Sequence, residues 1–137
     1  MAGNTDSERR AVLDAETIAV VGCSATPGKP AHEVPAYLDA HGYTVVPVNP
    51  YAERVLGHAA ADSLAEIDQR VDVVDVFRPP EEVPGIVDTA IARDDVGAVW
   101  LQVGIQHADA EERAAAAGLR VVSNSCIKVD HQRLVAP

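Results

Sequence analysis

Five short runs of β-branched and small apolar residues alternate with segments of helical spacing along the chain of 137 residues. Each run is five or six residues long and is followed by glycine, proline, asparagine or another residue typical of turns. This alternation predicts an α/β domain with a five-stranded parallel sheet, right-handed crossovers and helices on both faces. The expected strands cover residues 17–22, 43–48, 72–77, 97–102 and 119–123.

The segments between these runs predict the helices. A short helix is expected from Ser7, with Ser7 as its N-cap, because polar and apolar residues alternate there at helical spacing. We expect a Rossmann-like three-layer fold with strand order 3-2-1-4-5, in which residues 1–16 form an N-terminal tail and short helix and residues 17–137 form the domain. Further helices are expected over 31–41, 81–93, 107–117 and 127–134, with a shorter one near 62–67.

The charge of the chain excludes several classes of partner. It carries 21 acidic and 11 basic side chains, a net charge of −10, which repels nucleic acids and anionic membranes. The first 16 residues are polar and charged, and no apolar run approaches the length of a membrane span. Two cysteines are too few for a disulfide framework. We therefore expect a cytoplasmic protein.

Lysine is scarce, since Lys29 and Lys128 are the only two in the sequence. An acid-rich, lysine-poor chain suits a host with a very salty cytoplasm, because salt screens the self-repulsion of its surface. We expect the unfolding midpoint to rise between low and molar salt. A thermal melt in which the midpoint stays constant would contradict this adaptation.

The loop after the first strand is the first candidate site, because parallel sheets bind ligands beyond the carboxyl ends of their strands, where strand order reverses. The order 3-2-1-4-5 places that crevice beside strands 1 and 4. Gly22, Cys23 and Ser24 begin a loop of small residues that ends at Lys29, and the next helix offers free N–H groups to a diphosphate. The loop matches neither the P-loop nor the G-x-G-x-x-G pattern. A tight turn without a ligand is the alternative.

Two further segments follow the second and third strands. Asn49 stands where an NAD site usually has an acidic residue that binds the ribose, and this asparagine disfavours NAD. A role for Asn49 as the residue that ends the strand is equally compatible with the sequence. Phe77 and Arg78 offer a wall for a base and a cation for a phosphate. The alternative for Arg78 is a surface ion pair with Glu81 or Glu82.

The last two strands also end in polar or small residues. Gln102 and Gly104 follow strand 4, whereas Trp100 lies within it and is expected in the core. Cys126 follows strand 5, but none of the five histidines is an evident partner for it, and their spacing fits no metal motif. We therefore expect inert thiols at Cys23 and Cys126, and no catalytic or metal-binding residues.

In order, these segments read I-A-V-V-G-C-S (18–24), Y-L-D-A-H-G-Y-T-V-V-P-V-N-P (37–50), V-D-V-V-D-V-F-R (71–78), V-W-L-Q-V-G-I (99–105) and A-G-L-R-V-V-S-N-S-C-I-K (117–128). Together they resemble the small CoA-binding domain proteins, which are related to the nucleotide-binding domain of the succinyl-CoA synthetase α subunit. The likeness runs from about Thr17 to Leu134.

The resemblance implies a coenzyme A site whose residues carry over position by position. Gly22, Cys23 and Ser24 would face the diphosphate, and Lys29 would lie near a phosphate. The segment Asn124-Ser125-Cys126 is similar to the family's N-R-C, with serine in place of the arginine. The other implied contacts are Val48 and Asn49 beside the nucleotide, Phe77, Arg78 and Val83 on the adenine side, and Gln102, Val103 and Gly104 along the pantetheine.

The resulting prediction is a module that binds coenzyme A or an acyl-CoA and has no catalytic machinery. The synthetases phosphorylate a histidine in a second domain that has no counterpart in this sequence, so the ligase reaction is not expected. Two alternatives stay open: a thiol or disulfide reaction of CoA at Cys126, and an NAD-type redox sensor. A homodimer or a partner enzyme is compatible with either reading.

Overall fold

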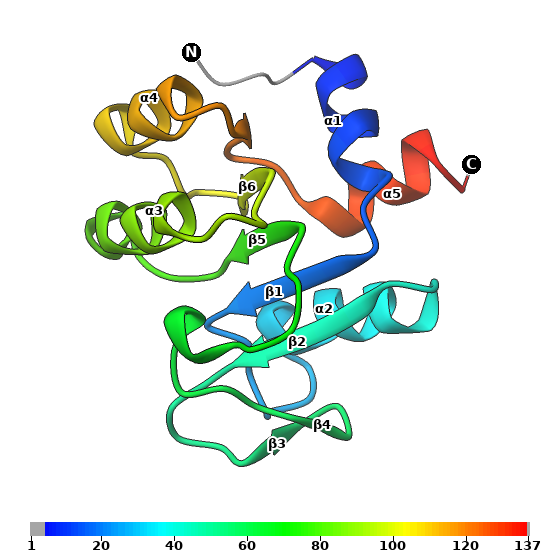
Figure 1. Ribbon diagram of the computed structural model, residues 1–137. Helices are drawn as coiled ribbons and strands as arrows, with labels where there is room; N and C mark the ends of the chain where they lie inside the picture. Colours follow the sequence, from blue (N-terminus) through cyan, green and yellow to red (C-terminus); the bar gives the residue numbers. More distant parts are fainter. Residues whose placement is uncertain (1–4, 137) are drawn as a thin grey trace.

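A five-stranded parallel sheet organises the protein, whose computed structural model describes residues 5–136 (Figure 1). All five expected strands are confirmed, within a residue or two at each end. They are β1 (Thr17–Val21), β2 (Thr44–Val48), β5 (Val73–Val76), β6 (Ala98–Leu101) and β7 (Arg120–Val122).

The strand order contains one error of prediction. The sheet runs β2-β1-β5-β6-β7, which is 2-1-3-4-5 for the five expected strands, so the order 3-2-1-4-5 is wrong. Pro47 supplies the reason: its carbonyl accepts a hydrogen bond from the Ala61 N–H at 2.9 Å, on the side of β2 away from β1. Proline has no N–H to donate on that side, so β2 suits the edge of the sheet and not its interior. Strand order therefore reverses between β1 and β5.

Alternate residues of each strand enter two separate cores, which makes the fold three-layered as expected. Ala19 and Val21 of β1 face one core, and Ile18 and Val20 face the other. The first core packs under α3 (Val83–Ala92), α4 (Ala108–Ala116) and the short 3-10 helix η1 (Leu64–Glu66). The second packs under α1 (Asp6–Leu13), α2 (Pro30–Ala40) and α5 (Ile127–Leu134).

The N-terminal helix is present, but its cap differs from the expected one. Thr5 is the N-cap of α1, because its hydroxyl accepts a hydrogen bond from the Glu8 N–H at 3.2 Å; Ser7 lies inside the helix. Val12 and Leu13 join this helix to the second core. Most of the tail expected over residues 1–6 lies outside the described residues.

No helix within residues 5–136 is both long and apolar enough to cross a membrane.

The connection from β2 to β5 crosses over β1 without an α-helix. It forms a small hairpin of β3 (Arg54–Val55) and β4 (His58–Ala59), below β2 in Figure 1, and then the single turn η1. The helix expected near 62–67 is therefore only this 3-10 turn. Ala61 forms an isolated parallel bridge with Val48, which brings the following residues to the carboxyl end of the sheet.

Candidate functional site

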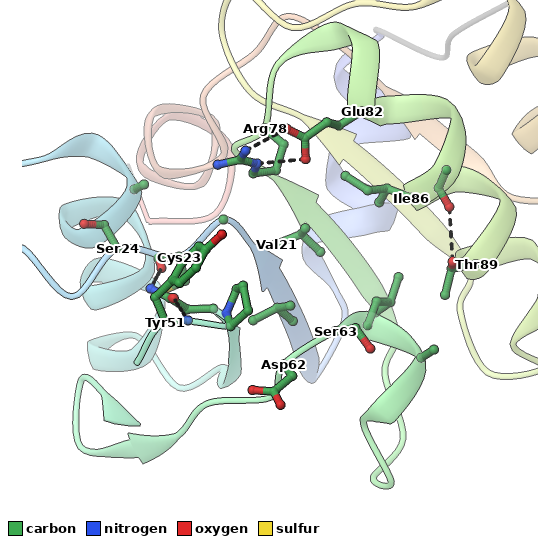
Figure 2. A pocket seen from close by; sticks show the side chains of 18 of the residues that line it. Val21, Cys23, Ser24, Tyr51, Asp62, Ser63, Arg78, Glu82, Ile86 and Thr89 are labelled. Carbon is green, nitrogen blue, oxygen red and sulfur yellow. Dashed lines mark hydrogen bonds and ion pairs between the residues drawn. The ribbon is translucent and has the colours of Figure 1, made fainter. Parts of the chain in front are cut away.

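A cleft of about 820 Å³ opens at the carboxyl ends of β1, β2 and β5 (Figure 2). It lies where strand order reverses, because the loops diverge there in a parallel sheet. Its walls come from the loop after β1, the chain after β2, and the segment that leads from β5 into α3 through the 3-10 helix η2 (Pro80–Glu82). Its volume lies within the ~300–1,000 Å³ of typical small-molecule sites.

Gly22 begins the loop after β1 and is needed for packing within the protein itself. Its φ is +87°, and a Cβ atom built there would lie 2.7 Å from Cδ of Arg78 and 2.9 Å from the carbonyl oxygen of Phe77. The absence of a side chain thus lets the end of β1 lie directly against the end of β5. The sequence prediction had attributed this glycine to the approach of a ligand.

The rest of this loop forms one wall of the cleft. Ser24 makes a hydrogen-bonded turn in which its hydroxyl accepts from the Thr26 N–H at 3.0 Å, while its own N–H donates to the Ala31 carbonyl at 2.9 Å. Lys29 is the exposed N-cap of α2 and lines the cleft. The loop therefore presents a lysine and the start of a helix to the hollow, the arrangement expected for an anion site.

Asn49 holds two walls of the cleft together. Its amide nitrogen donates to the Cys23 carbonyl at 3.0 Å, and its amide oxygen accepts from the Tyr51 N–H at 2.8 Å. The side chain thus braces the loop after β1 against the chain after β2. Asn49 and its neighbour Val48 both line the cleft.

Arg78 reaches the cleft but is already paired. Its guanidinium donates to both carboxylate oxygens of Glu82, at 3.0 Å from Nε and 2.6 Å from Nη2 (Figure 2). The surface ion pair that the sequence left as an alternative is therefore present, at the wall of the cleft itself.

Several predicted site residues do not line this cleft. Phe77 packs half-buried against the second core, and Val83 is completely buried in the first. The remainder follow β6 and β7, the two strands beyond the point of reversal; the predicted order had placed the crevice beside strand 4. These are Gln102, Val103, Gly104, Asn124 and Cys126.

The loops after β6 and β7 are joined to each other and to the core by hydrogen bonds within the protein. Asn124, at a φ of +54°, accepts a hydrogen bond from the Gly104 N–H at 2.8 Å and so joins the loops after β6 and β7. Trp100 is fully buried, as expected, and donates from its indole nitrogen to the Ser125 carbonyl at 2.9 Å. Val103 stays two-thirds exposed.

Gln102 is buried and forms a polar pair with the buried Asp75 of β5. It donates to Oδ1 of Asp75 at 2.7 Å, and the Asp75 side chain has no exposed surface. Burial raises the pKa of Asp75 to about 7. Burial, together with the nearby Asp75 charge, raises the pKa of the buried Cys23 thiol to about 12. Cys23 is therefore a poor nucleophile at neutral pH.

The residues that line the cleft but were not among the predicted site residues include Tyr51, Asp62, Ser63 and Ile86. The first three lie in the irregular connection after β2, where no hydrophobic period exists to place them. The bridge between Val48 and Ala61 carries Asp62 to the end of β2. An acidic residue therefore does lie near the end of the second strand. The asparagine at position 49 no longer counts against NAD.

Within residues 5–136 no three metal-ligating side chains gather in one place.

Comparison with known sequences decides the family. Residues 16–132 match the family described as CoA binding domain. The chain belongs to this CoA-binding domain family. The resemblance seen in the segments after the strands is thereby confirmed, and the matched range includes all five strands of the sheet and the whole cleft.

Members and relatives of the CoA-binding domain family include both small proteins and large ligases. An uncharacterized protein of Bacillus subtilis, YneT, is 38% identical over 83% of this chain and 84% of its own length. A hypothetical protein from Pyrococcus horikoshii superposes with a TM-score of 0.91 at 38% identity, covering 97% of this chain and 94% of that one. An ADP-forming acetate–CoA ligase of Archaeoglobus fulgidus is 30% identical over 65% of this chain, a match that spans only 14% of the ligase.

Proposed function

We propose that this protein binds coenzyme A or an acyl-CoA in the cleft between β1 and β5, as a binding module without chemistry of its own. The proposal is supported by one observation that joins two findings. The family match covers the whole domain, and the cleft at its strand reversal gathers two cations, Lys29 and Arg78, from different loops. Phosphate groups are the natural partners of such a pair.

The cleft offers complementary surfaces for the parts of a nucleotide. The diphosphate lies against the loop after β1, where Lys29 and the N-terminus of α2 supply positive charge. Ile86 gives an apolar surface for the base, and the 95% exposed ring of Tyr51 stands at the mouth, where it is free to stack. Asp62 accepts a hydrogen bond from the free 2′-hydroxyl of the ribose.

Calorimetric titration with CoA tests the proposal directly, and we expect micromolar-class affinity. Lys29→Ala and Arg78→Ala should each weaken binding by about tenfold or more, because each removes a charged donor to phosphate. Lys128→Ala is the matched control: this second lysine lies on α5, over the Tyr37 ring, and does not line the cleft. Its affinity should equal that of the wild type. No heat of binding at millimolar CoA would overturn the proposal.

A nucleotide cofactor of the NAD type is the second candidate, and Asp62 is the observation that favours it. NADH and CoA share an adenosine diphosphate portion, so both are plausible occupants of one cleft. Competition separates the two candidates. We expect NADH to displace bound CoA only at much higher concentration; displacement by equimolar NADH would transfer the assignment to NAD.

The non-catalytic part of the proposal rests on the two cysteines. Cys126 is the N-cap of α5 and does not line the cleft, and Cys23 keeps its proton at neutral pH. A Cys126→Ser protein should therefore retain the CoA affinity of the wild type and any background reactivity towards CoA disulfide. Loss of such reactivity in this variant would instead indicate an enzyme that acts through its thiol.

A further inference from the structure

The ion pair of Arg78 and Glu82 occupies one of the two forked edges with which the Arg78 guanidinium can bind a phosphate. An arginine binds a phosphate or a carboxylate with the same fork of two parallel N–H groups. Here Nε and Nη2 already donate to the two oxygens of Glu82, at 3.0 and 2.6 Å. Both side chains line the cleft, as Figure 2 shows. A ligand phosphate that seeks the same edge of the guanidinium meets this carboxylate first.

The packing of the aliphatic part of Arg78 keeps its guanidinium beside Glu82. Its Cδ and Cγ atoms lie against the backbone of Gly22, at 2.7 and 3.2 Å from the place where a Cβ would stand. The aliphatic part of the side chain is therefore packed against the end of β1, although the Arg78 side chain as a whole is about half exposed. Exchange of partners at the guanidinium is easier than movement of the whole side chain away from Glu82.

The charge balance of the cleft makes this exchange important. Its lining contains two cations, Lys29 and Arg78, and three carboxylates, Asp62, Glu81 and Glu82. With Arg78 neutralised by its partner, Lys29 faces the two remaining acids. The cleft is thus poorly suited to a polyanion until the Arg78 pair opens.

We propose that Glu82 sets the affinity of the cleft for its ligand by competing with a ligand phosphate for the Arg78 guanidinium. This inference rests on the proposed function, because CoA supplies the phosphate. The exposed pair contributes little to stability, so a phosphate of higher charge can replace the carboxylate without unfolding the segment. Arg78 also lowers the pKa of the Glu82 carboxyl, which keeps the competitor charged throughout the neutral range.

The chain contains a matched control for this role in the adjacent residue. Glu81 lines the same cleft and carries the same charge, but its carboxylate does not belong to the Arg78 pair. Glu82→Gln and Glu81→Gln therefore remove equal charge from the same wall, and only the first releases the guanidinium. Both substitutions keep the shape of the side chain, and thermal melts would check that both proteins remain folded.

Calorimetry with CoA at one fixed salt concentration gives the test. We expect Glu82→Gln to bind CoA about tenfold more tightly than wild type and Glu81→Gln about twofold more tightly, the latter reflecting general charge alone. In an Arg78→Ala background, Glu82→Gln should lose its advantage and give only the twofold effect.

The outcomes separate this inference from the function on which it rests. If wild-type protein binds CoA but Glu82→Gln and Glu81→Gln change the affinity equally, the competition is refuted and the proposed function stands. An unchanged tenfold gain in the Arg78→Ala background would also refute it. If wild type and every variant fail to bind CoA at millimolar concentration, both the function and the inference fall.

Discussion

Replacement of Asp75 by asparagine should stabilise the protein by about 2–3 kcal/mol at about pH 8.5 and have little effect at about pH 4. Asp75 lies in β5 opposite Val20 and Trp100, without exposed surface. Gln102 donates to its Oδ1 atom, and among residues 5–136 no group hydrogen-bonds its Oδ2 atom. A buried carboxylate with one hydrogen bond is costly, so the folded state favours the protonated acid.

The direction of the pH dependence follows from the two pKa values. The folded-state pKa is about 7, whereas the ordinary pKa of an aspartate is 3.8. Below the lower value both states hold the proton, and Asp75 costs nothing. As the pH rises towards the upper value, the unfolded chain releases its proton first, and stability falls until it levels off above about pH 7. Asparagine cannot ionise, so the variant escapes this loss.

Urea unfolding of both proteins at the two pH values provides the measurement, and Asp72→Asn provides a control of opposite sign. Asp72 accepts hydrogen bonds from the Thr17 N–H at 2.9 Å and from Arg70, and its pKa is lowered. Its replacement should destabilise the protein at neutral pH. Equal stability of wild type and Asp75→Asn at both pH values would contradict a buried Asp75 with a raised pKa.

Gly22→Ala should cost about 2–4 kcal/mol of stability and disrupt the cleft. The methyl group would meet both the Arg78 side chain and the Phe77 carbonyl, and the carbonyl belongs to a backbone that cannot easily move. The strand ends of β1 and β5 would be forced apart. Since both Arg78 and the loop after β1 line the cleft, CoA affinity should fall along with stability.

Gly42→Ala separates the effect of the clash from that of the backbone angle. Gly42 follows α2 at a φ of +95°, similar to that of Gly22, but nothing lies within 4 Å of the place where its Cβ would stand. This control should cost only about 1 kcal/mol, the usual penalty for alanine at a positive φ. Chemical denaturation of the two variants gives the comparison. Equal losses would show that the contact with β5 is unimportant.

The sequence predicted the elements of this fold far better than their arrangement. Hydrophobic periodicity located the strands and most helices because each element buries its own apolar side chains. The order of strands depends instead on which edges pair, and periodicity does not report this. One local signal was nevertheless present: Pro47 within the second strand indicates an edge, and it would have corrected the order.

The error in strand order also explains why some predicted site residues lie outside the cleft. The loops after β1, β2 and β5 form walls of one cleft, and the predicted residues Lys29, Asn49 and Arg78 all line it. The loops after β6 and β7 were added because strand 4 was expected beside the reversal. Asp62 shows a further limit: the crossing of the chain from β2 to β5 brings it to the cleft, and this irregular connection has no signature in the sequence.

Backbone amide chemical shifts, recorded by NMR during a titration with CoA, test the central claim most directly. The account predicts that the largest changes fall on the residues around the β1–β5 reversal: Gly22 to Lys29, Asn49, Ser63, Arg78 and Ile86. Gly104 and Asn124, which lie beyond β6 and β7, should change little. Shifts centred on Gly104, Asn124 and Cys126, with the β1–β5 cleft unaffected, would contradict the account.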